Sequence, residues 1–79
     1  MQPETIKQLI EEGMPGARVQ VVGDGQHFEA IIVSEAFEGL SMIKQHQLVY
    51  SALGDRMRAD IHALSMRTLT PTQWAAMQK

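Results

Sequence analysis

Three histidines, His27, His46 and His62, are the side chains of this sequence best suited to bind a metal or to move a proton near neutral pH. The sequence contains no cysteine, which excludes disulfides, thiolate zinc sites and cysteine nucleophiles within this chain. By residue type alone, each histidine is equally well explained by a hydrogen bond to the backbone or by solvation. The role of the histidines therefore depends on the elements that carry them.

The chain offers no group of residues that would make a supported nucleophile. No Ser/His/Asp arrangement is present, and no pair of carboxylates lies at the end of an expected strand. The sequence therefore predicts a protein that is not an enzyme.

Length and composition indicate a single small globular domain over residues 1–79. Seven Lys and Arg residues against nine Asp and Glu residues give a net charge of −2, which weighs against a dedicated nucleic-acid binder. No apolar run approaches the roughly 18 residues of a membrane span, and the first residues do not resemble a signal peptide. Together with the lack of cysteine, these features predict a cytoplasmic protein.

Hydrophobic periodicity and turn residues predict an α/β chain of the order α-β-β-α-α-β-α. Ile6, Leu9 and Ile10 give an amphipathic helix over residues 3–12. A Gly-Asp-Gly turn at 23–25 joins strands at 19–22 and 27–33 in a hairpin. The second strand is apolar on both faces, so we expect it in the interior of the sheet.

The second half of the sequence predicts a helical turn at 34–39, a longer helix, a strand at 61–69 and a short terminal helix. Ser41 caps the longer helix, which ends near Gly54 and whose apolar positions are Met42, Ile43, Leu48, Val49, Ala52 and Leu53. Residues 70–73 have the Thr-x-x-Gln spacing of a capping box. Trp74 should pack on the sheet, because so short a helix must dock in order to persist.

The connection from the second strand to the third contains helices, so the two strands should run parallel in a mixed three-stranded sheet. Parallel strands begin at the same end of a sheet. The residues at these two starts are His27 and His62. The topology therefore predicts that two of the three histidines lie at the same end of the sheet.

Five short segments carry a resemblance to a known family, at residues 23–28, 37–39, 47–50, 61–65 and 70–74. The Ile61-His62-Ala63 block followed by Thr-Pro-x-x-Trp at 70–74 is the most specific part. In these segments, which extend in order over nearly the whole chain, the sequence is similar to the BolA-like family and to its short bacterial branch. The resemblance implies a KH-like domain of the second topological type.

The resemblance also implies a partner, a monothiol glutaredoxin that holds a [2Fe-2S] cluster with glutathione. The family's invariant histidine corresponds to His62, and its second ligand, in the loop between the first two strands, corresponds to His27. We therefore expect His62 and His27 to be the metal ligands, with no cofactor in the isolated chain. His46 lies on the polar side of a helix, where we expect solvation or hydrogen bonding. A homodimer is left open.

Two functions are compatible with this resemblance. The favoured one is a non-catalytic adaptor that co-ligates a bridging cluster and acts in iron-sulfur trafficking or in iron and stress sensing. The alternative is a transcriptional or RNA-linked regulator that binds nucleic acid through a KH-like face. Lys44, Arg56, Arg58 and Arg67 would form a basic patch if the longer helix and the third strand are neighbours, but solvation explains each of them equally well. The net charge argues against this alternative, and so does the place of the Gly-x-x-Gly sequence at 13–16, which precedes the first strand.

Overall fold

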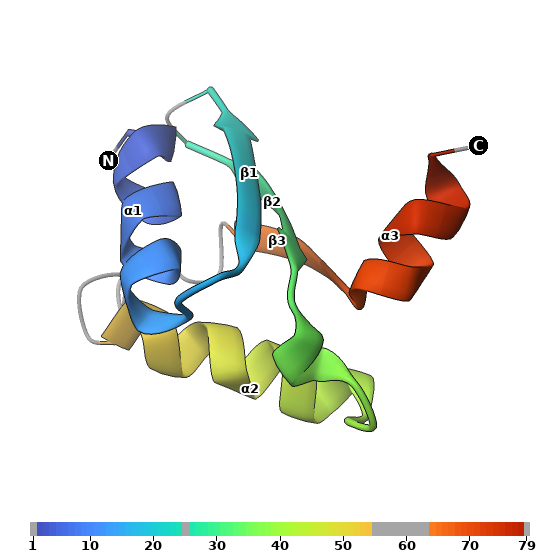
Figure 1. Cartoon of the computed structure of the whole chain (residues 1–79). Coiled ribbons are helices and arrows are strands. Elements are labelled where there is room, and N and C mark those ends of the chain that lie inside the picture. Colours follow the sequence, from blue (N-terminus) through green and yellow to red (C-terminus); the bar gives the residue numbers. More distant parts are fainter. Residues whose placement is uncertain (1, 25, 55–63, 79) are drawn as a thin grey trace.

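A three-stranded sheet with two long helices on one face forms the body of the chain in this computed structural model, which describes residues 2–24, 26–54 and 64–78 (Figure 1). The elements are α1 (Pro3–Gly13), β1 (Arg18–Gly23), β2 (Phe28–Val33), the 3₁₀ turn η1 (Glu35–Phe37), α2 (Met42–Leu53), β3 (Leu64–Leu69) and α3 (Pro71–Met77). The predicted order of elements is confirmed. Residues 61–63, expected as the start of the third strand, lie outside the described residues. Among the helices described, none has the length and apolar character needed to cross a membrane.

The sheet has the strand order β1-β2-β3, and both predicted pairings are confirmed. β1 runs antiparallel to β2, with Val19 opposite Ile32. β2 runs parallel to β3, with Phe28 opposite Leu64, so the two strands start at the same end of the sheet. β2 is the central strand, as its apolar character predicts.

α1 and α2 cover one face of the sheet, and the hydrophobic core lies between this face and the two helices. Phe28, Ala30 and Ile32 alternate along β2 and are buried in this layer. α1 and α2 meet closely where α1 ends, since a Cβ added to Gly13 would come within 2.5 Å of the Cβ of Ala52. We call the covered face the inner face of the sheet and the opposite one the outer face.

The core-facing side of α2 contains a glutamine, Gln45, whose side chain hydrogen-bonds to β3 and to residues just before α2. The Gln45 side-chain amide donates to the carbonyl oxygens of Phe37 (3.1 Å) and Leu40 (3.0 Å), while its Oε1 accepts from the hydroxyl of Thr68 (2.6 Å). Gln45 therefore links α2 to β3, to η1 and to the segment that follows η1. Among the apolar positions of α2, only Val49 and Leu53 are buried, Ala52 is half-buried, and Met42 and Ile43 are 68% and 72% exposed.

α3 has a capping box at its N-terminus and buries little of its surface. The predicted capping box is present: the Thr70 hydroxyl accepts from the N–H of Gln73 (3.2 Å), and Oε1 of Gln73 accepts from the N–H of Thr70 (2.9 Å). No residue of α3 is buried, and Figure 1 shows the helix apart from α1 and α2. The expectation that Trp74 packs firmly on the sheet is therefore wrong: its side chain is half-buried and lines an open hollow beside Val33.

Candidate functional site

His27 lies directly before β2, at the end of the β1–β2 hairpin, and its side chain is exposed. Asp24 fixes the backbone of His27 on both sides. Its Oδ1 accepts from the N–H groups of Gln26 and His27, each at 2.9 Å, and its own N–H donates to the carbonyl oxygen of His27 at 3.2 Å. The side chain of Asp24 therefore binds the backbone amides of Gln26 and His27, next to an exposed imidazole.

The hydrogen bonds that Asp24 accepts favour the ionised form of its carboxyl group. The N–H of His27, followed by that of Gln26, stabilises the carboxylate and lowers the pKa of Asp24 below its ordinary value of 3.8. Because the folded-state pKa is the lower one, the contribution of the turn to stability is fully present above the unfolded-state pKa. It is lost only as the pH falls through the lowered value. Asp24 is therefore ionised across the range in which imidazoles titrate.

Gly23 allows the hairpin to close tightly beside His27. A Cβ at this position would lie 2.6 Å from the carbonyl oxygen of His27 and 2.6 Å from the ring of Phe28, closer than real side chains approach. The glycine therefore sets how near the end of β1 comes to the start of β2.

Replacing Asp24 with Ala should loosen this turn without unfolding the domain, because the side chain is exposed and outside the core. Amide hydrogen exchange at Gln26 and His27 should accelerate, since both N–H groups lose their acceptor. Asp24→Asn is the matched control, because its amide oxygen can still accept, and it should retain part of the protection. Exchange that is equally fast in the wild-type protein and in Asp24→Ala would contradict this account.

Of the predicted ligands, the structure describes only His27; His62 lies outside the described residues, two positions before Leu64 in the sequence. His46 is half-buried within α2. The described part of the chain contains no group of three or more His, Cys, Asp or Glu residues arranged to hold a metal.

The candidate basic patch is not assembled from the residues that are described. Lys44 is on α2 and lines a hollow with Leu40 and Leu48, whereas Arg67 points from β3 into a different hollow on the outer face. Arg56 and Arg58 lie outside the described residues. The Gly-x-x-Gly sequence at 13–16 ends α1 and precedes β1, as expected, and the KH-like description stays a prediction.

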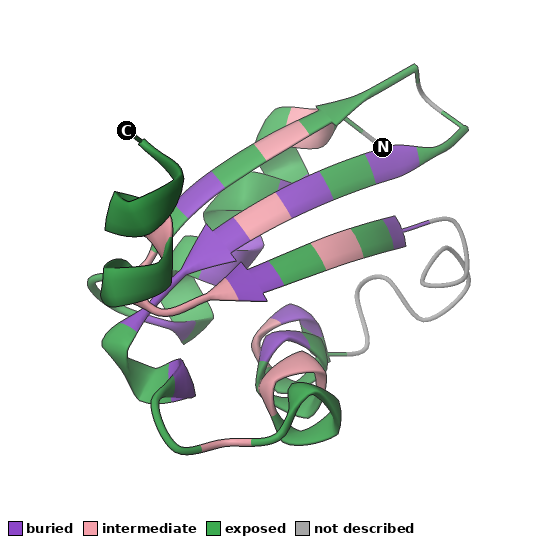
Figure 2. Cartoon of the chain, turned by 90° about the vertical axis from the view of Figure 1, so that its right-hand side faces the viewer, coloured by how far each residue is buried: buried purple, intermediate pink, exposed green. Residues whose placement is uncertain are grey.

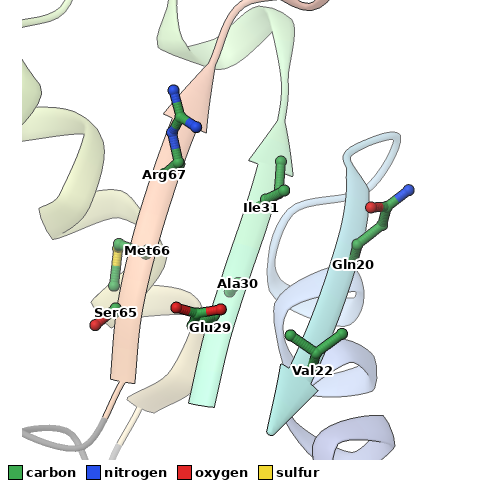
Figure 3. Close-up of a pocket in the computed structure, with 8 residues that line it drawn as sticks. All are labelled: Gln20, Val22, Glu29, Ala30, Ile31, Ser65, Met66 and Arg67. Carbon is green, nitrogen blue, oxygen red and sulfur yellow. The ribbon is translucent and has the colours of Figure 1, made fainter.

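Sequence reasoning does not reveal a hollow of about 320 Å³ on the outer face of the sheet (Figure 3). Side chains from all three strands surround it, namely Gln20, Val22, Glu29, Ile31, Ser65 and Arg67. Residues in β1 and β2 point alternately to the two faces of the sheet, and those on the outer face are less buried than their neighbours. This alternation is the feature of the sequence from which the outer face could have been predicted. Which of these residues lie together depends on the strand register, and the sequence alone does not fix the register.

A comparison with protein families matches residues 8–73 to the model of the BolA-like protein family. The chain belongs to the BolA-like family. This BolA-like chain is 36% identical over 80 residues to the acid stress protein IbaG of Escherichia coli K12, covering all of this chain and 95% of that protein. It is also 36% identical over 78 residues to the DNA-binding transcriptional regulator BolA of Vibrio cholerae, covering 99% of this chain and 71% of that protein.

Solved structures agree with the family assignment. A BolA protein homologue from Coxiella burnetii superposes on this BolA-like chain with a TM-score of 0.85 at 46% sequence identity. The match covers 95% of this chain and 97% of that one. Of the relatives named above, one is called an acid stress protein and the other a DNA-binding transcriptional regulator.

Proposed function

We propose that this chain is a non-catalytic adaptor that binds a monothiol glutaredoxin and contributes histidine ligands, His62 and His27, to a [2Fe-2S] cluster shared by the two proteins. The observation that carries the proposal is the parallel pairing of β2 with β3. This pairing brings the starts of β2 and β3 to the same end of the sheet. His27 directly precedes β2, and His62 is two residues before the first residue of β3 in the sequence.

The donor type and the accessibility of His27 fit this role. Imidazole replaces thiolate on one iron of some [2Fe-2S] centres, where it raises the reduction potential. A ligand to a shared cluster must be reached from a second protein, and His27 is exposed on a backbone that Asp24 holds in place. The cluster, when bound, would supply one-electron chemistry, while this chain binds, orients and releases it through imidazole nitrogens.

Histidine ligation would also make the complex sensitive to acid, because only the neutral imidazole binds a metal. That property suits a role in stress sensing, and the relative from Escherichia coli is named an acid stress protein. We therefore include sensing beside cluster trafficking in the proposed function.

Visible circular dichroism of the chain mixed with a cluster-loaded monothiol glutaredoxin tests the proposal. His62→Ala should abolish the signature of the mixed complex while the far-ultraviolet spectrum is retained. His27→Ala should weaken or alter the signature less, because another ligand can substitute. His46→Ala is the matched control and should leave the signature unchanged. An unchanged signature in His62→Ala would show that this residue is not a ligand.

The second candidate is a DNA-binding regulator, which the name of the Vibrio cholerae relative supports. Binding to DNA should then weaken with salt, with a slope of log affinity against log salt of about −0.9 for each phosphate contact. Removing the exposed cation with Arg67→Ala should reduce that slope by about 1 if Arg67 contacts a phosphate. A mixed complex with glutaredoxin and no salt-dependent DNA binding favours the adaptor.

A further inference from the structure

β1 forms one border of the sheet, and only one of its two sides is paired. The strand order is β1-β2-β3, so β2 pairs with one side of β1 and no described element pairs with the other. Figure 2 shows β1 as the outermost strand, with α1 behind the sheet and not in its plane. We call the unpaired side of residues 18–24 the free edge. A free edge is a template for pairing with another strand.

Alternate residues of β1 direct their backbone groups to the free edge. The N–H of Asp24 donates to the carbonyl oxygen of His27, so this opposed pair is hydrogen-bonded. Hydrogen-bonded and non-hydrogen-bonded pairs alternate in an antiparallel ladder, and the register of β1 with β2 is unbroken. By this alternation, Val19, Val21 and Gly23 point their N–H and C=O groups outward, and the residues between them bond to β2.

The free edge lacks the devices that usually prevent strand pairing. Proteins protect exposed edges with charged side chains, proline, bulges or very short strands. The six residues of β1 are Arg-Val-Gln-Val-Val-Gly, which include one charge, at the first position, and no proline. The register contains no bulge, and Val22 is 61% exposed. The composition of β1 therefore favours pairing with a further strand.

The hydrogen-bonding groups of the free edge are complementary to those of a second copy. Two β1 strands that run antiparallel about an axis through Val21 bring Val19 of each copy opposite Gly23 of the other. Each outward N–H group then donates to an outward carbonyl oxygen of the other copy. A register shifted along the strand leaves some of these groups without a partner. Backbone hydrogen bonding therefore selects one symmetric register.

Opposite charges meet at both ends of this register. It brings Arg18 of each copy opposite Asp24 of the other, and both side chains are exposed in the single chain. The two residues belong to the same alternate row, and opposed residues of antiparallel strands point to the same face. Oδ1 of Asp24 accepts from the N–H groups of Gln26 and His27, which leaves its other carboxylate oxygen for the guanidinium. Charge complementarity therefore supports the register that hydrogen bonding selects.

We infer that this chain self-associates through the free edge of β1, with Val21 of both copies on the two-fold axis. The two sheets then form one continuous sheet, with α1 and α2 of both copies on the same face, in a two-layer α/β architecture. Val21, half-buried and packed against the core in the single chain, gains an apolar neighbour in Val21 of the other copy. The inference does not depend on the proposed function, because the free edge contains no histidine.

Amide hydrogen exchange at low and at high protein concentration tests the pairing residue by residue. The amides of Val21 and Gly23 should exchange about tenfold slower or more at the high concentration, because they gain an acceptor from the second copy. Gln20 and Val22 already bond to β2, so their exchange should not change and serves as the internal control. Sedimentation velocity should show a dimer that forms over the same concentration range.

Two charge reversals test the register. Arg18→Glu places like charges at both ends of the pairing, and so does Asp24→Lys, so each variant alone should dimerise about tenfold more weakly. Mixed together, the two variants should form a heterodimer with the wild-type affinity, because every reversed charge then faces an opposite one. Arg67→Glu, the same kind of change on β3, is the matched control and should dimerise like the wild type.

Val21→Pro removes the central donor of the pairing and should abolish the dimer. Its N–H points away from β2, so the proline breaks no bond within the hairpin. Melting curves establish that each variant is folded, and if Val21→Pro does not fold, the charge reversals decide alone. A sedimentation coefficient that does not rise with concentration would overturn the inference, and so would a dimer that both reversals leave intact. Protection of Val21 and Gly23 only after a glutaredoxin is added would assign the free edge to a strand of that protein and would also overturn it.

Discussion

Acidification from about pH 7.5 to about pH 5.5 is expected to dissociate the mixed complex, with a slope that counts the histidine ligands. A free imidazole has a pKa of about 6.5, and protons compete with iron for the same nitrogen. With one histidine bound, the apparent affinity should fall about tenfold per pH unit below that value, and with two it should fall about a hundredfold. The wild-type chain should show the steeper slope and His27→Ala the shallower one.

Two carboxylates close to His27 in the sequence bear on this titration. Asp24 lies opposite His27 in the ladder, and its pKa is lowered by the N–H groups of His27 and Gln26, so Asp24 is ionised throughout the range tested. Glu29 is the neighbouring outward-facing residue on β2, and Glu29→Gln separates its influence from that of the histidines.

Loss of cluster from glutaredoxin alone must be measured over the same pH range and subtracted. A flat profile in the mixed complex would mean that neither His62 nor His27 binds iron. Binding would then depend on protein contacts only.

Local rules were sufficient to predict much of the fold. The hairpin follows from a Gly-Asp-Gly turn between β-rich runs, and the capping box of α3 follows from its Thr-x-x-Gln spacing. The parallel pairing of β2 and β3 follows from the rule that a strand reached through helices returns in the same direction. These features are decided by residues close in sequence or by chain connectivity.

The faces of α2 could not be predicted from residue type, because a polar residue lies on the side that faces the core. Gln45 is four residues before Val49, on the same side of the helix, and is satisfied by the carbonyl oxygens of Phe37 and Leu40 and by the hydroxyl of Thr68. These partners come from distant segments.

Truncating Phe37 to Ala should destabilise the domain far more than truncating Trp74, although Trp74 is the residue that sequence reasoning selects. Phe37 is fully buried in η1, and its carbonyl oxygen accepts from the Gln45 side chain at 3.1 Å. Removing a buried phenyl ring typically costs about 3 to 5 kcal/mol. At about 0.05 to 0.15 kcal/mol per residue, the 79 residues of this chain have a total of only about 4 to 12 kcal/mol.

The expected result is a melting temperature lowered by about 12 °C or more in Phe37→Ala, or a chain already unfolded at room temperature. Trp74→Ala should cost about 1 kcal/mol, because the indole is only half-buried on a helix that buries no residue. Phe37→Leu is the control that keeps an apolar side chain in the same site and should lie between them. Thermal and urea unfolding followed by circular dichroism measure all three. If Trp74→Ala proves the more destabilising change, α3 packs against the sheet in solution more closely than the hollow between Trp74 and Val33 allows.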